Sequence, residues 1–483
     1  MLFNSLDFAV FLPIVFFLYW FVTKHSLRLQ NALIVVASYV FYGWWDWRFL
    51  SLIIFSTLVD YWVGKQLGKT DVARKRKTLL WMSILVNLGF LGFFKYYNFF
   101  AENFVAAFTF FGADIQPNTL DIILPVGISF YTFQTMSYTI DVYRKNLKPT
   151  NDFVAFSAFV SFFPQLVAGP IERATNLLPQ FYQKRKFDYA QAVDGMRQIL
   201  WGLFKKVVIA DNCAVYANEI FNNSADYNGS TLLLGAIFFT FQIYGDFSGY
   251  SDIAIGTARL FGFNLMQNFA FPYFSRDIAE FWRRWHISLS TWFRDYVYIP
   301  LGGSRGGTLM KVRNTFIIFI VSGFWHGANW TFIIWGALNA VYFLPLLLTK
   351  RNRKNTDVVA ENTIFPNVKE LFSMGITFFL TVLAWVFFRA ESSIVAIKYL
   401  NEVFSASLFE LPETSKLFNF KVFSLLLLTF VLTEWLGRKY QFALQGITIF
   451  QINVVRWLVY SLIIYIIIMF MPTNETPFIY FQF

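Results

Sequence analysis

Residues 319–336 read FIVSGFWHGANWTFIIWG, which places a single histidine, His326, between two apolar runs. The segments beyond the two runs, Arg276–Arg313 and Lys350–Lys354, are rich in Lys and Arg. Basic loops accumulate on the cytoplasmic side of membrane proteins, so both outer ends are predicted to lie in the cytoplasm. The two runs then form a helical hairpin, and His326 lies near its tip, deep in the bilayer.

The composition of the whole chain agrees with a membrane protein. Of its 483 residues, 57% are hydrophobic and only 14% are charged, whereas soluble domains are about one quarter charged. A soluble chain of this length would expose the surfaces of several domains, and the charge present is too little to solvate them. The 63 Phe, 24 Tyr and 16 Trp residues exclude disorder. The sequence therefore predicts an all-α polytopic membrane protein.

The membrane spans follow from the apolar runs, because a bilayer core of about 30 Å needs roughly 20 apolar residues per helix. We expect about 12 transmembrane helices in a single membrane domain, residues 1–483, with a core over 1–440, a last span near 454–471 and a tail over 472–483. The segment Phe153–Ile171 contains Pro164 and Pro170 and is expected to be re-entrant or buried. The expected spans are 7–22, 31–45, 49–63, 79–94, 121–140, 193–211, 231–255, 315–325 with 331–348, 371–388, 420–435 and 454–471.

The distribution of Lys and Arg predicts the orientation of the chain. The first ten residues contain neither, whereas the linkers over 24–28 and 65–77 are basic. The N-terminus is therefore expected outside, the basic loops inside, and the tail after the last span outside as well. This pattern accounts for most of the net charge of +11. It predicts contact with anionic membrane lipids and not with nucleic acid.

Few residues are available for metal or cofactor chemistry. The chain has one cysteine, Cys213, and three histidines, His25, His286 and His326. This composition excludes cysteine-built metal sites and most histidine-rich clusters, so we predict no metal and no cofactor. A transporter or channel would fit the composition too, but the two halves show no clear repeat. The spans are expected to carry no row of Asp, Glu or Arg that would mark an ion pathway.

A second histidine lies in a basic, tryptophan-rich stretch, FWRRWHISLSTWFRDYVYIPLGG over residues 281–303. As one helix, it would place Trp282, Trp285, Leu289, Trp292 and Tyr296 on a single face. Arg283 and Arg294 would lie on another face, as in a helix at a membrane interface. His286 is then either incidental to that helix or a functional residue.

His326 also has two interpretations. A structural histidine would satisfy its ring on a backbone carbonyl, whereas an ionisable group inside the membrane is by default a candidate for function. Burial favours the neutral form of a side chain whose unperturbed pKa is about 6.5. A neutral histidine can accept a proton, and a positioned general base contributes about 10²–10⁴-fold to a rate.

Several further blocks accompany the two histidine stretches. They are LPVGISFYTFQ (124–134), FFPQLVAGPI (162–171), FSGYSD (247–252), WHGA (325–328) and the end of the chain, FIYFQF (478–483). In this order the chain resembles the membrane-bound O-acyltransferases, in particular the branch of the bacterial alginate O-acetyltransferase membrane component. The resemblance implies a ring of helices around a transmembrane tunnel. It also matches His326 with the family's catalytic histidine and His286 with its second functional position.

The resemblance further implies a function. Cytoplasmic acetyl-CoA would be the donor substrate, and the final acceptor would be an extracellular polysaccharide, reached through a secreted SGNH-type acetyltransferase partner. The location would be the bacterial inner membrane. Arg283, Arg284 and Arg294 are candidates for binding the donor's phosphates, and Trp325 and Asn329 are candidates for supporting the histidines. The alternatives are a D-alanyl transferase, a lipid or protein acyltransferase with a longer acyl chain, and a transporter.

The tail reads PTNETPFIYFQF over residues 472–483. Its two prolines disfavour helix, and an extended chain would separate Ile479, Phe481 and Phe483 from Tyr480 on opposite faces. The tail is then either an aromatic anchor at the membrane interface or an acyl relay. In the relay, it folds back into the outer mouth of the tunnel, and the Tyr480 hydroxyl accepts the acetyl group transiently.

Overall fold

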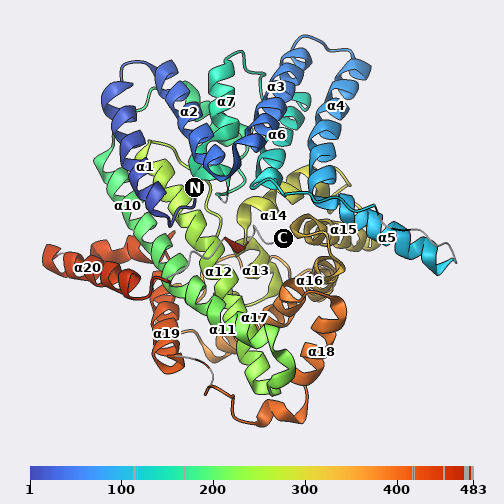
Figure 1. The fold of residues 1–483 in the computed structure, drawn as a ribbon, viewed down its shortest axis with the longest axis vertical. Helices are drawn as coiled ribbons and strands as arrows, with labels where there is room; N and C mark the ends of the chain where they lie inside the picture. The colour runs from blue at the N-terminus through green and yellow to red at the C-terminus, as the bar shows by residue number, and fades with distance from the viewer. Residues whose placement is uncertain are drawn as a thin grey trace. The chain divides into compact units, whose positions relative to one another are not determined.

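The computed structural model describes residues 1–111, 116, 118–167, 169–415, 417, 419–449, 452–472 and 478–479. These residues are mostly helical and contain no strand, in agreement with the predicted all-α class (Figure 1). They form two compact units, an N-terminal unit (Met1–Gly195 with Thr257–Met266) and a C-terminal unit (Met196–Gly256 with Gln267–Phe483). The prediction of one membrane domain over 1–483 stays a prediction.

In the N-terminal unit, α2 packs against α7, and α6 packs against both α3 and α4. The segment expected to be re-entrant or buried is broken between α7 and α8 and buried along most of its length. The helices are α1 (Leu6–Phe17), α2 (Leu27–Asp46), α3 (Leu50–Leu67), α4 (Ala73–Leu91), α5 (Tyr97–Phe110), α6 (Ile128–Tyr143), α7 (Phe153–Ser161), α8 (Phe163–Leu166), α9 (Ala174–Leu177) and the start of α10 (Tyr189–Leu203).

In the C-terminal unit, α15 and α16 form an antiparallel pair, and α16 also packs against α17. A π-helical segment, η5 (Phe204–Ala210), joins α10 to α11. The remaining helices are α11 (Asp211–Asn222), α12 (Gly229–Leu260), α13 (Ile278–Arg284), α14 (Ile287–Phe293), α15 (Thr308–His326), α16 (Trp330–Leu348), α17 (Val368–Arg389), α18 (Ser393–Val403), α19 (Phe420–Gly437) and α20 (Asn453–Met469).

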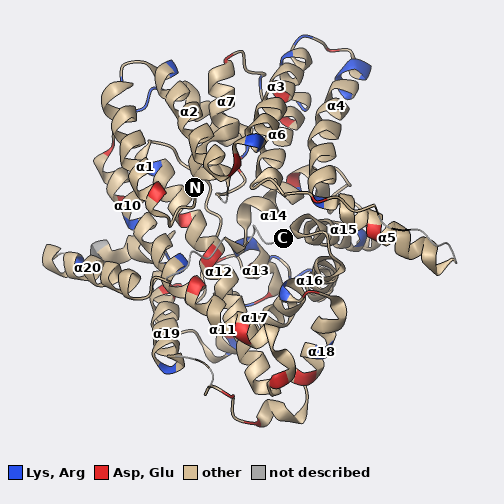
Figure 2. Cartoon of the chain, viewed as in Figure 1, with Lys and Arg blue, Asp and Glu red and all other residues tan. Residues whose placement is uncertain are grey.

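Five helical stretches of the described residues are long and apolar enough to cross a membrane. They are Ala73–Phe110, Gly229–Leu260, Trp330–Leu348, Val368–Arg389 and Phe420–Gly437. Figure 2 shows these stretches with few charges along most of their length and basic residues gathered at the start of α4. The chain is thus a multi-pass membrane protein. The count of about 12 spans stays a prediction, because several apolar helices are shorter than a bilayer crossing requires, among them Asn453–Met469.

Candidate active site

The predicted hairpin around His326 is confirmed. Helix α15 ends at His326, and α16 begins four residues later at Trp330. The two helices meet closely at Gly323 and Gly336, where any side chain would collide with a backbone carbonyl of the facing helix. Asn329 caps α16, because its side chain accepts a hydrogen bond from the Thr331 N–H at 3.0 Å.

The prediction of one continuous helix around His286 is wrong. Helix α13 ends at Arg284, and His286 adopts a left-handed conformation (φ 43°, ψ 55°) before α14 begins. The cause is Asn268, whose backbone oxygen accepts the Ile287 N–H at 2.9 Å and whose side-chain oxygen accepts the Ser288 hydroxyl at 2.9 Å. A non-glycine residue in this conformation costs of order 1–3 kcal/mol, and such strain is typical of functional sites.

The two histidines, 40 positions apart in the sequence, lie together in the C-terminal unit. Their ring centroids are 6.5 Å apart, and their exposed fractions are only 1% for His286 and 3% for His326. The Trp325 ring contacts both, at 4.9 Å from His326 and 6.1 Å from His286. The structure therefore brings His286, Trp325 and His326 into one cluster, whereas Asn329 caps the neighbouring helix.

Aromatic rings surround this cluster. Phe247 packs edge-on against His286 at 4.6 Å, and Trp335 and Phe388 pack against His326 at 5.2 and 5.3 Å. This apolar burial lowers the pKa of His286 to about 3, so the imidazole stays neutral at physiological pH. Neither nitrogen of His286 has a hydrogen-bond partner among the described residues. The ring can therefore donate to or accept from a bound substrate in a site that excludes water.

Paired charges lie within the expected spans 193–211 and 231–255 of the C-terminal unit. Asp246 and Asp252 of α12 are buried against two lysines of η5. The Lys205 ammonium lies 2.5 Å from Asp252, and the Lys206 ammonium lies 2.9 Å from Asp246 and 2.7 Å from Asp211. A buried charge is expensive unless it is paired, and here each charge has its partner.

Two glycines of α12 explain how these ion pairs form. A side chain at Gly245 or Gly249 would meet the backbone of the segment that contains Lys205. Because glycine has no side chain, α12 approaches η5 closely at both positions. In the sequence, the alternation of glycine and aspartate over 245–252 was the signal for these buried ion pairs. A search by hydropathy alone does not detect it.

The described part of the tail is seated in this charged region. The Ile479 N–H donates a hydrogen bond to the Asp246 carboxylate at 2.6 Å. The fully buried Phe478 ring lies 4.5 Å from Tyr250 and 5.8 Å from Phe247, the residue that also packs on His286. Tyr480, Phe481 and Phe483 lie outside the described residues, so the proposed relay stays a prediction.

The three arginines predicted to bind the donor all have partners within the C-terminal unit. Arg283 donates to the backbone carbonyl of Asn352 at 2.7 Å. Arg284 pairs with Glu280 at 2.9 Å, and Arg294 pairs with its neighbour Asp295 at 2.6 Å. Their role in donor binding stays a prediction. The described residues contain no group of three or more His, Cys, Asp and Glu side chains that could hold a metal ion.

A model of the membrane-bound O-acyltransferase family matches residues 78–385, a range that includes both buried histidines. The chain belongs to the membrane-bound O-acyltransferase family. It is 42% identical to the "Probable alginate O-acetylase AlgI" of Pseudomonas aeruginosa over 86% of this chain and 77% of that protein. It is 36% identical to the peptidoglycan O-acetyltransferase of Helicobacter pylori, over 83% and 79% of the two chains.

A more distant relative is the teichoic acid D-alanyltransferase of Bacillus subtilis, which is 31% identical over 45% of this chain and 57% of that protein. The chain is therefore an O-acyltransferase, and the transporter alternative is excluded. The family model does not cover the tail. The buried contacts of Phe478 and Ile479 therefore come from the structure and not from the family match.

Proposed function

We propose that this membrane O-acyltransferase transfers the acetyl group of acetyl-CoA to hydroxyl groups of an extracellular polysaccharide. The observation that carries the proposal is the pair of buried histidines, 6.5 Å apart and walled by aromatic rings. The alginate O-acetylase and the peptidoglycan O-acetyltransferase, which are similar over most of the chain, support acetyl as the group and a polysaccharide as the final acceptor.

His326 is proposed as the general base. It accepts the proton of the acceptor hydroxyl while the hydroxyl oxygen attacks the thioester carbonyl carbon. The new C–O bond forms, the C–S bond breaks, and the proton on His326 passes to the leaving thiolate. A thioester is already activated, so orientation and a proton acceptor are the main requirements of the site.

His286 is proposed to stabilise the oxyanion of the tetrahedral intermediate. Its low pKa keeps the ring neutral, and a neutral imidazole offers one N–H donor. The hydrogen bonds from Ile287 and Ser288 to Asn268 fix the backbone next to His286, and the Phe247 ring packs against the imidazole. Preorganised donors in a site without water are the usual source of oxyanion stabilisation.

The tail is proposed to relay the acetyl group. The buried contacts of Phe478 and Ile479 support a position of the tail beside His286. The Tyr480 hydroxyl would be the first acceptor, and an extracellular SGNH-type transferase would take the acetyl group from the tyrosine ester to the polysaccharide. In this scheme the protein lies in the bacterial inner membrane with both termini outside. Acetyl-CoA stays in the cytoplasm, and only the acetyl group crosses the membrane.

D-Alanyl transfer is the second candidate. The similarity to a teichoic acid D-alanyltransferase over 45% of the chain favours it. Both reactions use the same histidine chemistry and differ in the donor. Membranes supplied with radiolabelled acetyl-CoA or with a radiolabelled D-alanyl carrier protein separate them.

The test is acetyl transfer from radiolabelled acetyl-CoA in membranes that contain equal amounts of each variant. We expect His326→Ala to lower transfer by at least about 10²-fold, as loss of a general base does. His286→Ala should lower it by about 10²–10³-fold, as loss of an oxyanion donor does. His25→Ala is the matched control, because His25 is exposed and lies in the N-terminal unit. Full activity of His326→Ala would overturn the mechanism.

A further inference from the structure

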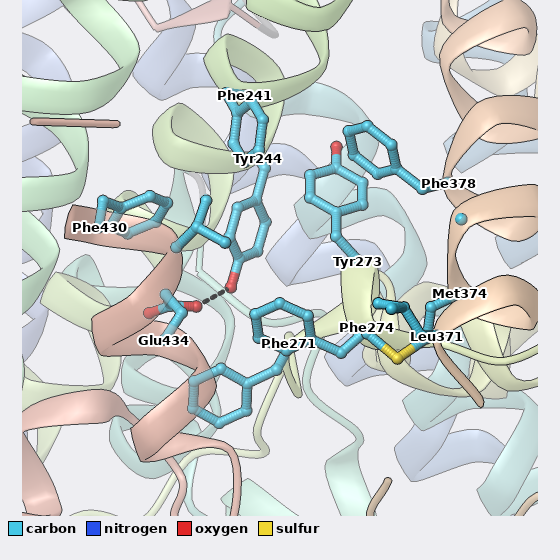
Figure 3. Close-up of a pocket in the computed structure, with 12 residues that line it drawn as sticks. Phe241, Tyr244, Phe271, Tyr273, Phe274, Leu371, Met374, Phe378, Phe430 and Glu434 are labelled. Atoms are coloured by element: carbon cyan, nitrogen blue, oxygen red, sulfur yellow. Dashed lines mark hydrogen bonds between the residues drawn. The ribbon is translucent and has the colours of Figure 1, made fainter. Parts of the chain in front are cut away.

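The C-terminal unit contains a cavity of about 300 Å³ that is separate from the histidine cluster. Figure 3 shows it between α17 on one side and α19 on the other, with α12 above. Its walls are the residues Phe241, Tyr244, Phe271, Tyr273, Phe274, Leu371, Met374, Gly375, Phe378, Phe430, Val431 and Glu434. Nine of these twelve have no nitrogen or oxygen atom in a side chain, so the lining is apolar.

The polar side chains in the wall are already satisfied by protein groups. The Tyr244 hydroxyl donates to Glu434 (Figure 3), and the Trp201 N–H donates to the same carboxylate at 2.9 Å. The Tyr273 hydroxyl donates to the Thr240 carbonyl at 2.7 Å. A ligand in the cavity is therefore offered apolar contacts, and a polar sugar or the pantetheine of coenzyme A would lose its hydrogen bonds to water there.

The wall of the cavity that α17 forms is partly exposed, and we infer that the cavity opens there. Leu371 is 59% exposed and Gly375 is exposed, whereas Tyr244 and Phe430 on the opposite wall are buried. Both α17 and α19 are long and apolar enough to span a membrane. The opening therefore lies on a surface that is expected to contact lipid chains.

Two lysines mark one end of the opening. Lys369 is two residues before Leu371 on α17, and Lys439 follows the end of α19, one turn beyond Glu434. Both are exposed, and neither has a hydrogen bond or ion pair with the described residues. The Trp435 N–H donates to the Ile364 carbonyl at 2.8 Å, which ties the end of α19 to the segment before α17.

We propose that this cavity binds part of one acyl chain of an anionic phospholipid, whose phosphate lies at Lys369 and Lys439. The apolar lining suits the acyl chain, and the two exposed lysines suit the anionic phosphate. Tryptophans such as Trp435 are common at the level of lipid headgroups. The volume of about 300 Å³ is at the lower end of ligand sites and accommodates part of one acyl chain and not a whole lipid. The site does not depend on the proposed acetyl transfer.

A chain in the cavity would stabilise the aromatic residues that pack next to the histidine cluster. The rings of Tyr244 and Tyr273 pack against Trp285, at 6.2 and 5.9 Å. Trp285 directly precedes His286 and also packs on Trp385 at 5.1 Å. The acyl chain would thus lie one aromatic layer away from the site and be a structural lipid, not a substrate.

The test uses the full chain in nanodiscs of phosphatidylcholine that contain a small fraction of phosphatidylglycerol with a diazirine on one acyl chain. After illumination, peptide mass spectrometry locates the labelled residues. We expect saturable labelling at Leu371, Met374 and Phe378 that unlabelled phosphatidylglycerol competes away. Equal labelling of the outward-facing Leu425 and Leu428 would mean that only bulk lipid is seen and would overturn the proposal.

Gly375→Phe is the variant chosen to fill the cavity, because Gly375 is part of its wall and no atom lies within 4 Å of a side-chain carbon built there. Labelling should fall at least about tenfold, since the ring occupies the space of the chain. Gly89→Phe is the matched control, an exposed helical glycine of α4 with equally open surroundings. Gly375→Leu is the smaller variant to use if the phenylalanine prevents folding. Undiminished labelling in a folded variant at position 375 would refute the site.

The lysines are tested together as Lys369→Gln with Lys439→Gln. This variant should lower labelling by the phosphatidylglycerol probe to the level of a phosphatidylcholine probe with the same chain. Lys421→Gln, at the other end of α19, is the control and should change nothing. If palmitoyl-CoA displaces the probe at lower concentrations than phosphatidylglycerol does, the cavity is a donor acyl site and the lipid proposal is wrong.

Discussion

The docking of the tail leads to a quantitative prediction about Phe478→Ala. The Phe478 ring is fully buried between Tyr250 and Phe247. Truncating a buried phenylalanine to alanine costs about 3–5 kcal/mol, which lowers the docked population of the tail relative to the free one by roughly 10²–10³-fold or more. The hydrogen bond from the Ile479 N–H to Asp246 uses the backbone and is not removed by this change.

Thiol labelling can measure this release. The only cysteine, Cys213, is buried, so a Cys213→Ala background leaves Ile479→Cys as a single probe. We expect the thiol introduced at position 479 to react slowly with a maleimide while Phe478 is present. The reaction should be about 10²–10³-fold faster in Phe478→Ala, in proportion to the free population. Phe409→Ala is the matched control, because Phe409 is 90% exposed in the same unit.

Two results would contradict the docking of the tail or the relay. An unchanged labelling rate in Phe478→Ala would show that the burial of Phe478 does not hold the tail. Faster labelling together with full acetyl transfer would leave the docking intact and refute the relay, because the reaction would then proceed with the tail released.

The remaining predictions concern the relay, the buried charges and pH. Tyr480→Phe keeps the ring and removes the hydroxyl, so acetylation of the extracellular product should fall to background, and unchanged acetylation would leave the tail an anchor. Lys206→Met leaves Asp211 and Asp246 without their cation and should lower the free energy of unfolding by about 3–5 kcal/mol, measured as a lower melting temperature. Adding Asp246→Asn should restore part of the lost stability. An unchanged melting temperature in both variants would contradict the ion-pair assignment. The pKa of His286 is about 3 in the folded protein and about 6.5 when unfolded. The unfolded state therefore binds the extra proton, and stability should fall as the pH drops below 6.5 and continue to fall towards 3. His286→Gln should show a smaller loss of melting temperature between pH 7 and pH 5, and an identical loss would place the acid sensitivity elsewhere.

Local composition and spacing determined several features of this protein without tertiary information. The scarcity of charge established the membrane class, and the apolar runs on either side of His326 predicted the hairpin that α15 and α16 form. The prolines of Phe153–Ile171 predicted a broken segment. His326 was recognised as a candidate because a polar residue between two apolar runs stands out in a single chain. His286, in a basic and tryptophan-rich stretch, became a candidate mainly through the family resemblance.

Contacts between distant segments decided the rest. The break at His286 arises because Asn268 takes hydrogen bonds that a continuous helix would have used within itself. Lys206 is tolerated inside the protein because Asp246, 40 positions away, lies 2.9 Å from it, and the same aspartate receives the Ile479 N–H of the tail. The free-energy cost of a buried charge depends on which group faces it. That partner is set by three-dimensional packing and cannot be read from hydropathy along the chain. For the same reason, the cavity between α17 and α19 exists only once two helices from separate parts of the sequence have packed on α12.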